Sequence, residues 1–288
     1  MREGFTHAHP DNNNDKVSEA VARIMNKKAV IYATGERGVY VGRLERHFRR
    51  ANVPSSLLVS LEDDLELVDP VRRDRITGKS FLIPAGMDLA VETHGAHVAL
   101  FFLDELGTDL ARLKPMMKHV AHLGDQYCFQ GIGGESDVVQ FANILRYQRP
   151  SLNTASQIVE DWLAETSPQA AIADPRILQA VHLIKHHYDQ NISVEWIARQ
   201  VGLSVPRLVQ LFKLVTGTPI RRFRLWHRIF VTAAKLNAGM ALTDAAMSAG
   251  FSDYAQFSRT YRKLAGANPS DARDNTEIHI SGYPNAGA

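Results

Sequence analysis

The feature that most constrains this chain is a helical pattern that occurs twice in its last third, with an offset of 48 residues. Ala198 precedes Gly202 by four positions, and Ala246 precedes Gly250 by the same interval. A helix-turn-helix unit needs a small residue where its helices cross, and a glycine where the turn adopts a positive φ. The repetition therefore predicts two such units within one helical domain.

Helical periodicity separates an inward from an outward face in the second helix of each unit. The expected inward residues are Leu208, Leu211, Phe212 and Val215 in the first unit and Phe257, Tyr261 and Leu264 in the second. Ser204 and either Ser252 or Asp253 are the expected N-caps. The outward positions, which with Ser204 are our candidate DNA-contacting residues, are Pro206, Arg207, Val209, Gln210, Lys213, Tyr254, Ala255, Ser258, Arg259 and Arg262.

A single long helix is expected between the two units. It begins near Pro219, a residue favoured in the first turn, and runs for about 20 residues without a helix breaker. A helix of that length spans roughly 30 Å, close to the approximately 34 Å that separates successive major-groove faces of DNA. Both second helices could then enter successive major grooves on one side of a duplex.

The charge distribution supports a polyanionic partner for this part of the chain. Residues 175–273 hold 14 Lys+Arg against 5 Asp+Glu, a balance of +9, whereas the remainder holds 19 against 26, a balance of −7. A basic module on an acidic chain is typical of nucleic-acid binding. A membrane-surface helix would leave its apolar face unpaired, whereas these apolar faces are used between helices.

These segments resemble a known family. "SVPRLVQLFKLVTG", "RIFVTAAKL" from Arg228, "AAMSAGFSDYAQFSRTYRKLAGANPSDAR" and the closing Gly266, Pro269 and Arg273 are similar to the AraC/XylS family of bacterial transcription regulators. The resemblance covers residues 175–273 and implies seven helices with two helix-turn-helix units that contact adjacent major grooves.

The sequence departs from the family at positions that face bases. Gln210 stands where the family commonly has Arg, and an amide pairs best with adenine rather than guanine. Val209 and Ala255 offer only apolar contact, for instance to a thymine methyl group. The operator sequence therefore does not follow from the family.

The first part of the chain is expected to be a β-barrel followed by helices, which makes the whole protein α+β. Seven short apolar or alternating segments between turn signals run from Ala29 to about Leu103. Helical spacing follows in "TDLARLKPMMKHVAHLG", "ESDVVQFANILRYQ" and "LNTASQIVEDWLAET". This order of elements is similar to the cupin-like domain that family members often carry for effector binding and dimer contact.

The expected organisation has four parts. Residues 1–165 form a cupin-like sensing and dimerisation domain, 166–174 a linker, 175–273 the DNA-binding domain and 274–288 a flexible tail. A single cysteine, Cys128, excludes an intrachain disulfide. The first residues contain no apolar signal-peptide core, so a cytoplasmic location is expected.

Two arginine clusters in the acidic part are candidates for binding an anionic effector. Their members are Arg46, Arg49, Arg50, Arg72, Arg73 and Arg75. Guanidinium groups suit phosphates and carboxylates. Ion pairs with Glu62, Asp63, Asp64 or Glu66 are the simpler interpretation.

A metal-dependent cupin enzyme is the rival hypothesis. The histidine pairs His94/His97 and His119/His122 lack the spacing and the acidic partner of a three-ligand site. We therefore predict no metal, no cofactor and no catalytic residue, and expect a non-enzyme.

Dimerisation is expected from an apolar stripe in "LNTASQIVEDWLAET", formed by Leu152, Ile158, Val159, Trp162 and Leu163. This stripe either packs on the barrel or meets its twin. The resulting hypothesis is a homodimeric transcription regulator that binds double-stranded DNA and is controlled by a small effector in the barrel. By family habit it would be an activator that contacts RNA polymerase. The alternative is a regulator with a ligand-free barrel, controlled by a partner protein or by its own abundance.

Overall fold

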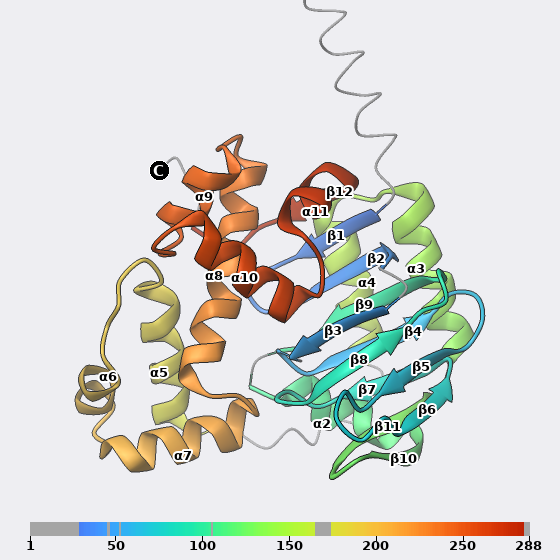
Figure 1. Cartoon of the computed structure of the whole chain (residues 1–288), viewed down its shortest axis with the longest axis horizontal. Helices are drawn as coiled ribbons and strands as arrows, with labels where there is room; N and C mark the ends of the chain where they lie inside the picture. Colours follow the sequence, from blue (N-terminus) through green and yellow to red (C-terminus); the bar gives the residue numbers. More distant parts are fainter. Residues whose placement is uncertain (1–28, 45–46, 52, 105, 165–173, 285–288) are drawn as a thin grey trace, which may run out of the picture.

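The computed structural model describes residues 29–44, 47–51, 53–104, 106–164 and 174–284. Two β-sheets stacked face to face make up the first part of the protein, and a helical domain lies beside them (Figure 1). The predicted linker falls at residues that lie, except for Asp174, outside the described part of the chain.

The larger sheet has the strand order β10-β11-β7-β4-β9-β2-β1-β12, and the smaller one the order β3-β8-β5-β6. The strand bounds are β1 Ala29–Ala33, β2 Gly38–Arg43, β3 His47–Ala51, β4 Ser56–Ser60, β5 Leu65–Val68, β6 Arg75–Gly78, β7 Ser80–Ile83, β8 Asp88–Glu92, β9 His97–Phe102, β10 Met117–Leu123, β11 Gln126–Ile132 and β12 Thr276–Ile280. All pairs are antiparallel except the parallel pair of β1 and β12.

Strand β4 shows why these segments are so apolar. Alternate side chains of a strand point to opposite faces. Leu57 and Val59 join the core beneath the helices, whereas Leu58 joins the core between the two sheets. All five residues of β4 are buried because both faces of this sheet are covered.

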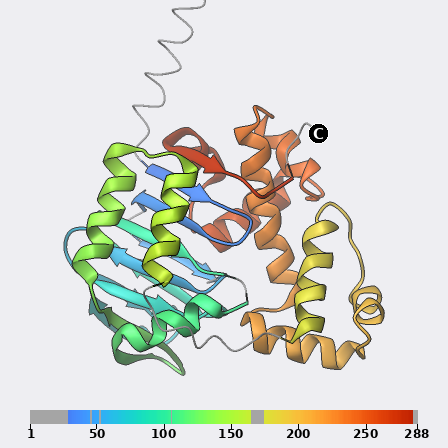
Figure 2. The ribbon, with the colours of Figure 1, turned by 180° about the vertical axis from the view of Figure 1, so that it is seen from behind.

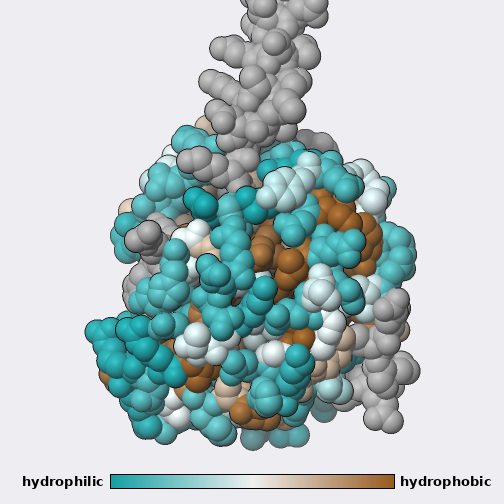
Figure 3. All heavy atoms as spheres, turned by 90° about the vertical axis from the view of Figure 1, so that its right-hand side faces the viewer, coloured by the Kyte–Doolittle hydropathy of each residue, from teal (hydrophilic) through white to brown (hydrophobic). Residues whose placement is uncertain are grey.

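The helices that follow the barrel strands cover the outer face of the larger sheet (Figure 2). They are α2 Thr108–Leu113, the short 3₁₀ helix η1 Lys114–Met116, α3 Glu135–Gln148 and α4 Leu152–Ala164. The apolar stripe predicted on α4 packs on the barrel, with the Trp162 ring 5.8 Å from that of Phe101. Of the two alternatives, the stripe therefore packs against the sheet of its own chain. On the side shown in Figure 3, hydrophobic residues lie in groups among hydrophilic ones.

Two segments differ from the sequence-based expectation. The helix expected over "TDLARLKPMMKHVAHLG" ends early, because Pro115 removes a backbone donor and the chain continues as β10 with Ala121 and Leu123 facing inward. The predicted flexible tail is wrong for residues 276–280. These residues form β12, which pairs with β1 along its whole length.

The helical domain contains, among the described residues, the seven helices that the family resemblance implies. They are α5 Pro175–His186, α6 Val194–Gln200, α7 Val205–Thr216, α8 Ile220–Asn237, α9 Leu242–Ser248, α10 Tyr254–Ala265 and α11 Pro269–Asn275. One apolar core joins α5, α6, α7 and the start of α8. A second core joins α8, α9 and α10 with barrel residues such as Ala33 and Val53. Within the described residues, no helix is long and apolar enough to span a membrane.

Candidate nucleic-acid interface and interdomain cavity

The two helix-turn-helix units have the same local geometry. Gly202 adopts a φ of 67° and Gly250 a φ of 94°. After each glycine, the next backbone N–H donates to the alanine of the pattern: Leu203 to Ala198 O at 2.9 Å, and Phe251 to Ala246 O at 3.2 Å. The turn predicted from the sequence is thus formed in both units.

Helix α7 presents its predicted outer face to solvent. Ser204 is its N-cap and Pro206 lies in its first turn. Leu208 and Phe212 are fully buried, whereas the outward residues Ser204, Pro206, Arg207, Val209, Gln210 and Lys213 are exposed. Arg207 Nη1 donates to Gln210 Oε1 at 2.9 Å. The amide of Gln210 therefore already has one polar partner, which a base edge would have to replace or share.

Helix α10 begins at an aspartate cap, the second of the two residues predicted for this role. Asp253 Oδ1 accepts from the Gln256 backbone N–H at 2.6 Å. This hydrogen bond, together with one from Ser252, lowers the pKa of the Asp253 carboxyl. The capped turn sets where the following basic face begins.

The outer face of α10 is only partly as predicted. Ala255, Arg259 and Arg262 are exposed, and Ser258 is half-buried. Tyr254 is also half-buried, because its hydroxyl lies 3.1 Å from Ser270 Oγ at the start of α11. Its hydroxyl thus contacts α11, although the sequence predicts Tyr254 on the outward face.

The two arginines of α10 differ in their contacts. Arg262 folds back on its own helix, donating from Nη2 to Ser258 Oγ at 3.1 Å and from Nε to Ser258 O at 3.3 Å. Arg259 is exposed, and its charge contributes to the lowered pKa of Asp253. Its guanidinium is thus available to a base edge or a phosphate.

A cavity that sequence reasoning missed lies between the barrel and the second unit. Its volume is about 350 Å³, within the range of roughly 300–1,000 Å³ typical of small-molecule sites. Ile31 and Tyr40 of the barrel form one wall, and Trp226, Ile229 and Phe230 of α8 form another. No local pattern could have revealed it, because its walls come from segments about 200 residues apart.

The remaining walls of the cavity connect it to the candidate DNA interface. Phe257 and Tyr261 of α10 line it, as do Ala272 of α11 and Ile278 of β12. Burial raises the pKa of Tyr261 to about 12, so this phenol is neutral near pH 7. A molecule in the cavity would touch the inner face of the helix whose outer face carries Arg259.

The cavity lining is mainly apolar, and its charged side chains are Arg43, Asp271 and Arg273. The Tyr40 hydroxyl donates to Arg43 O at 2.8 Å, and burial raises the pKa of Tyr40. The side chain of Arg43 is exposed at the lining. The arrangement suits a mainly apolar ligand with one acidic end.

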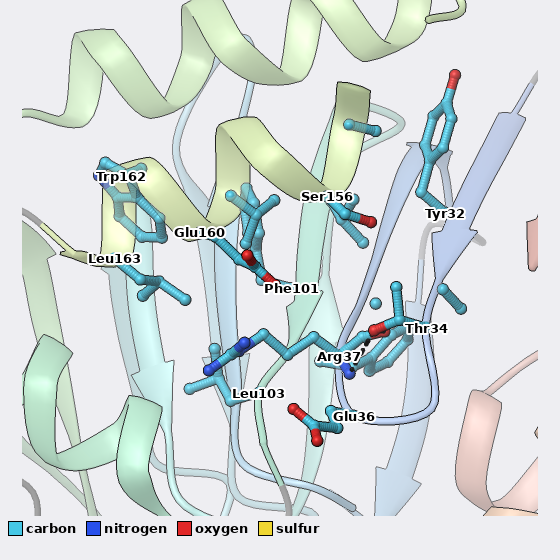
Figure 4. A pocket seen from close by; sticks show the side chains of 16 residues that line it. Tyr32, Thr34, Glu36, Arg37, Phe101, Leu103, Ser156, Glu160, Trp162 and Leu163 are labelled. Atoms are coloured by element: carbon cyan, nitrogen blue, oxygen red, sulfur yellow. Dashed lines mark hydrogen bonds between the residues drawn. The ribbon is translucent and has the colours of Figure 1, made fainter. Parts of the chain in front are cut away.

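A smaller cavity lies between the β1–β2 hairpin and α4 (Figure 4). Its volume of about 50 Å³ is close to that of one or two water molecules. Arg37 extends along it and pairs with the buried Asp109 at 2.6 Å. This cavity is too small for an organic effector.

Three of the arginines proposed to hold an effector form separate ion pairs. Arg49 pairs with Asp88 at 2.8 Å, Arg75 with Glu66 at 2.6 Å, and Arg72 with Asp125. Arg73 is exposed in a turn with a φ of 66°. The position of Arg46 and the side chain of Arg50 lie outside the described part of the structure. Arg75 thus makes one of the ion pairs that the simpler interpretation expected.

Two of the histidines considered for a metal site lie beside glutamates. His97 Nδ1 is 2.6 Å from Glu62 Oε1, and His94 Nε2 is 3.7 Å from Glu66 Oε1. His119 and His122 are exposed on strand β10 and not on a helix. In the described ranges, no group of three or more His, Cys, Asp or Glu residues is arranged to hold a metal ion.

The geometry defines a double helix-turn-helix domain joined to a cupin-like barrel. Comparison with known proteins finds sequence relatives of the helical domain and a structural neighbour of the two domains together. Residues 197–275 match the family model described as "Helix-turn-helix domain". The arabinose operon regulatory protein of Escherichia coli is 33% identical over 112 residues, which are 38% of this chain and 38% of that protein. The regulator ExsA of Pseudomonas aeruginosa is 30% identical over 95 residues, covering 33% of this chain and 34% of ExsA.

Residues 197–275 therefore carry a helix-turn-helix domain of the AraC/XylS type, as the sequence indicated. The chain matches little more than a third of the length of these curated relatives. A crystal structure of ToxT from Vibrio cholerae superposes with a TM-score of 0.54 at 12% identity, covering 86% of this chain and 97% of ToxT. This likeness confirms the predicted α+β fold, a cupin-like domain followed by a helix-turn-helix domain.

Proposed function

We propose that this protein is a cytoplasmic, sequence-specific transcription regulator and not an enzyme, and that a small molecule in the interdomain cavity controls it. The observation that carries the proposal is the pair of like-built units with exposed outer faces on α7 and α10. The +9 balance of the domain supplies attraction to the phosphate backbone.

Gln210 and Arg259 are the residues proposed to contact bases. Gln210 suits adenine and Arg259 suits guanine, because each can form two hydrogen bonds to the major-groove edge of that base. Lys213 lies near the end of α7 and is proposed to contact phosphate. The other predicted interface residues would position these three on the duplex.

Operator titration of single-residue variants tests this assignment. Gln210→Ala and Arg259→Ala should each weaken operator binding by about 1–3 kcal/mol and relax discrimination at base pairs roughly 10 bp apart. Lys213→Ala should weaken binding to all sequences alike. If Arg259→Ala weakens every sequence equally, Arg259 contacts phosphate and base reading by α10 is wrong.

The proposed effector is an apolar molecule with a carboxylate. The cavity lining is dominated by aromatic and aliphatic side chains, and its two cations, Arg43 and Arg273, outnumber its one carboxylate, Asp271. ToxT has been crystallised with an unsaturated fatty acid bound, and its fold matches this chain with a TM-score of 0.54 at 12% identity. This placement moves the effector from the barrel interior, which side chains such as Phe81 and Leu89 fill, to the barrel's boundary with α8 and α10.

A cavity-filling variant tests the effector site with oleate as the probe. Ala233 lines the cavity from α8, so Ala233→Phe should abolish oleate binding measured by calorimetry while DNA binding persists. Ala238→Phe, at the exposed end of α8, is the matched control and should bind oleate normally. Equal oleate affinity in both variants would exclude this cavity as the site.

Activation, dimer formation and contact with RNA polymerase complete the proposal. The activator VirF of Yersinia enterocolitica is 33% identical over 91 residues, 31% of this chain and 34% of VirF. Because the apolar stripe of α4 is used within the chain, a dimer would need another surface. Sedimentation of the intact protein measures whether it forms a dimer.

A further inference from the structure

One buried arginine lies between the two helix-turn-helix units. Arg228 is in the middle of α8, is 4% exposed, and is held by uncharged oxygens of the loop between α5 and α6. Its Nε donates to Tyr188 O at 2.6 Å, and its Nη2 to Gln190 O and to Asn191 Oδ1, each at 3.2 Å. The loop belongs to the first unit, so Arg228 ties that unit to the connecting helix.

The same guanidinium touches the turn of the second unit. A Cβ atom added to Gly250 would lie 2.8 Å from Arg228 Nε and 2.8 Å from Tyr188 O. At Gly202, the equivalent position of the first unit, a Cβ would meet nothing within 4 Å. The two turns are therefore alike in backbone shape but differ in surroundings, and only the second rests on this arginine.

Neighbouring cations make further contacts with the same loop, and the loop's position favours positive charge. Arg224 Nη2 donates to Ile192 O at 2.9 Å, and Lys235 Nζ lies 5.9 Å above the ring of Tyr188. The loop follows the C-terminus of α5, where backbone carbonyls carry partial negative charge. Burial, and next the charge of Arg224, lower the pKa of Arg228 to about 10, so the group is still cationic at pH 7.

Attachments spaced along α8 hold the first unit, including the Arg224–Ile192 hydrogen bond and the apolar packing at the start of α8. Phe212 of α7 packs on Phe223 with ring centroids 5.3 Å apart, and Arg228 binds the loop five residues further along the helix. Five residues correspond to about 7.5 Å along the axis. Attachment near one end of α8 alone would let the unit swing about that end, whereas a further attachment along the helix opposes rotation.

We propose that Arg228 is a positioning residue that sets the orientation of α7 relative to α10, and thereby the spacing of the two DNA half-sites that the protein accepts. This inference rests on the proposed function. Arginine is required because its planar fork reaches several acceptors at once, whereas a lysine offers a single ammonium group.

Selection from a random DNA duplex library with the intact protein tests the proposal. Arg228→Gln and Arg228→Lys should enrich the same two half-site sequences as the wild type, but over several spacings instead of one. On the duplex with the wild-type spacing, their affinity should fall at least about tenfold, because the two units no longer bind simultaneously in register. Arg221→Gln removes one exposed cation from the same helix and should keep the single spacing.

Asn191→Ala provides a second test of the proposal if the Arg228 variants do not fold. It removes one acceptor of Arg228 from an exposed loop residue and should broaden the spacing preference to a smaller degree. Enrichment of one unchanged spacing by folded Arg228 variants, or by Asn191→Ala where those variants fail to fold, would overturn the assignment. If the wild type itself enriches no sequence, the proposed function fails instead.

Discussion

At the scale of single residues, the two turn glycines allow a matched comparison. Gly202→Ala should cost about 1–2 kcal/mol of unfolding free energy, because a side chain at positive φ is strained even in open space. Gly250→Ala should cost about 1–3 kcal/mol more, because its Cβ would meet the Arg228 guanidinium and the Tyr188 carbonyl. Urea unfolding of both variants measures the difference. Equal losses would show that the crowding at Gly250 is relieved without cost.

His227 predicts a pH dependence of stability. It is 4% exposed on α8, between the rings of Tyr188 and Tyr283, and burial followed by the charge of Lys185 lowers its pKa from 6.5 to about 3. Between these values the unfolded chain binds the proton and the folded chain does not, so stability falls as the pH falls from about 6.5 toward 3.

Replacing the imidazole removes this dependence. From pH 7.5 to pH 5, the wild type should lose about 2 kcal/mol more unfolding free energy than His227→Phe. His182→Gln, at an exposed position of α5, should behave as the wild type. Denaturant unfolding at the two pH values gives the comparison, and parallel losses in the wild type and His227→Phe would contradict a buried neutral imidazole.

At the scale of secondary-structure elements, β12 links the DNA-binding domain to the barrel. It follows α11 directly and pairs with β1, while Arg149 binds Glu277 at 3.1 Å and Tyr32 stacks on His279 at 4.6 Å. Ile278 also lines the interdomain cavity. The strand therefore connects the sheet, the cavity and the second unit.

Ending the chain after Asn275 should destabilise the barrel by about 3 kcal/mol, because several backbone hydrogen bonds of β1 lose their partners. Amide hydrogen exchange of residues 29–33 should accelerate in the same variant. A chain ending after Pro284 keeps β12 and serves as the control. Unchanged protection of residues 29–33 in the shorter chain would mean that β12 contributes little to the sheet.

At the scale of the whole molecule, the separation of charge predicts a steep salt dependence of DNA binding. Exposed cations of the helical domain include Arg207, Lys213, Arg221, Arg259, Arg262 and Lys263. If about six phosphates are neutralised, log K should fall with a slope of about −5 against log salt, roughly a thousandfold between 50 and 200 mM. Fluorescence anisotropy of a labelled duplex measures the slope.

Variants that each remove one positive charge test which cations contribute to that slope. Lys263→Ala should reduce its magnitude by about 1. Arg176→Ala should leave it unchanged, because this arginine already pairs with Asp174 at 2.7 Å. A flat salt response of the wild type would remove the electrostatic part of the proposal.

The sequence by itself determined the helical domain. Helical period, turn glycines, the Asp253 cap and the uninterrupted run of α8 are local signals, because each depends on residues within one or two turns of one another. The seven barrel strands predicted from Ala29 to Leu103 all exist, since alternation of buried side chains is also local. The burial of Leu208, Phe212, Phe257 and Leu264 follows from the same periodicity.

Only the tertiary structure decided how distant segments meet. Strand β12 forms because the free edge of β1 lies beside it, and "TEIHI" alone gives no sign of that edge. Tyr254 turns toward Ser270, Arg228 reaches Tyr188, and the cavity closes between β1 and α8 for the same reason. These contacts join residues from 16 to about 250 positions apart, and their energies depend on burial and close approach, which a local pattern does not encode.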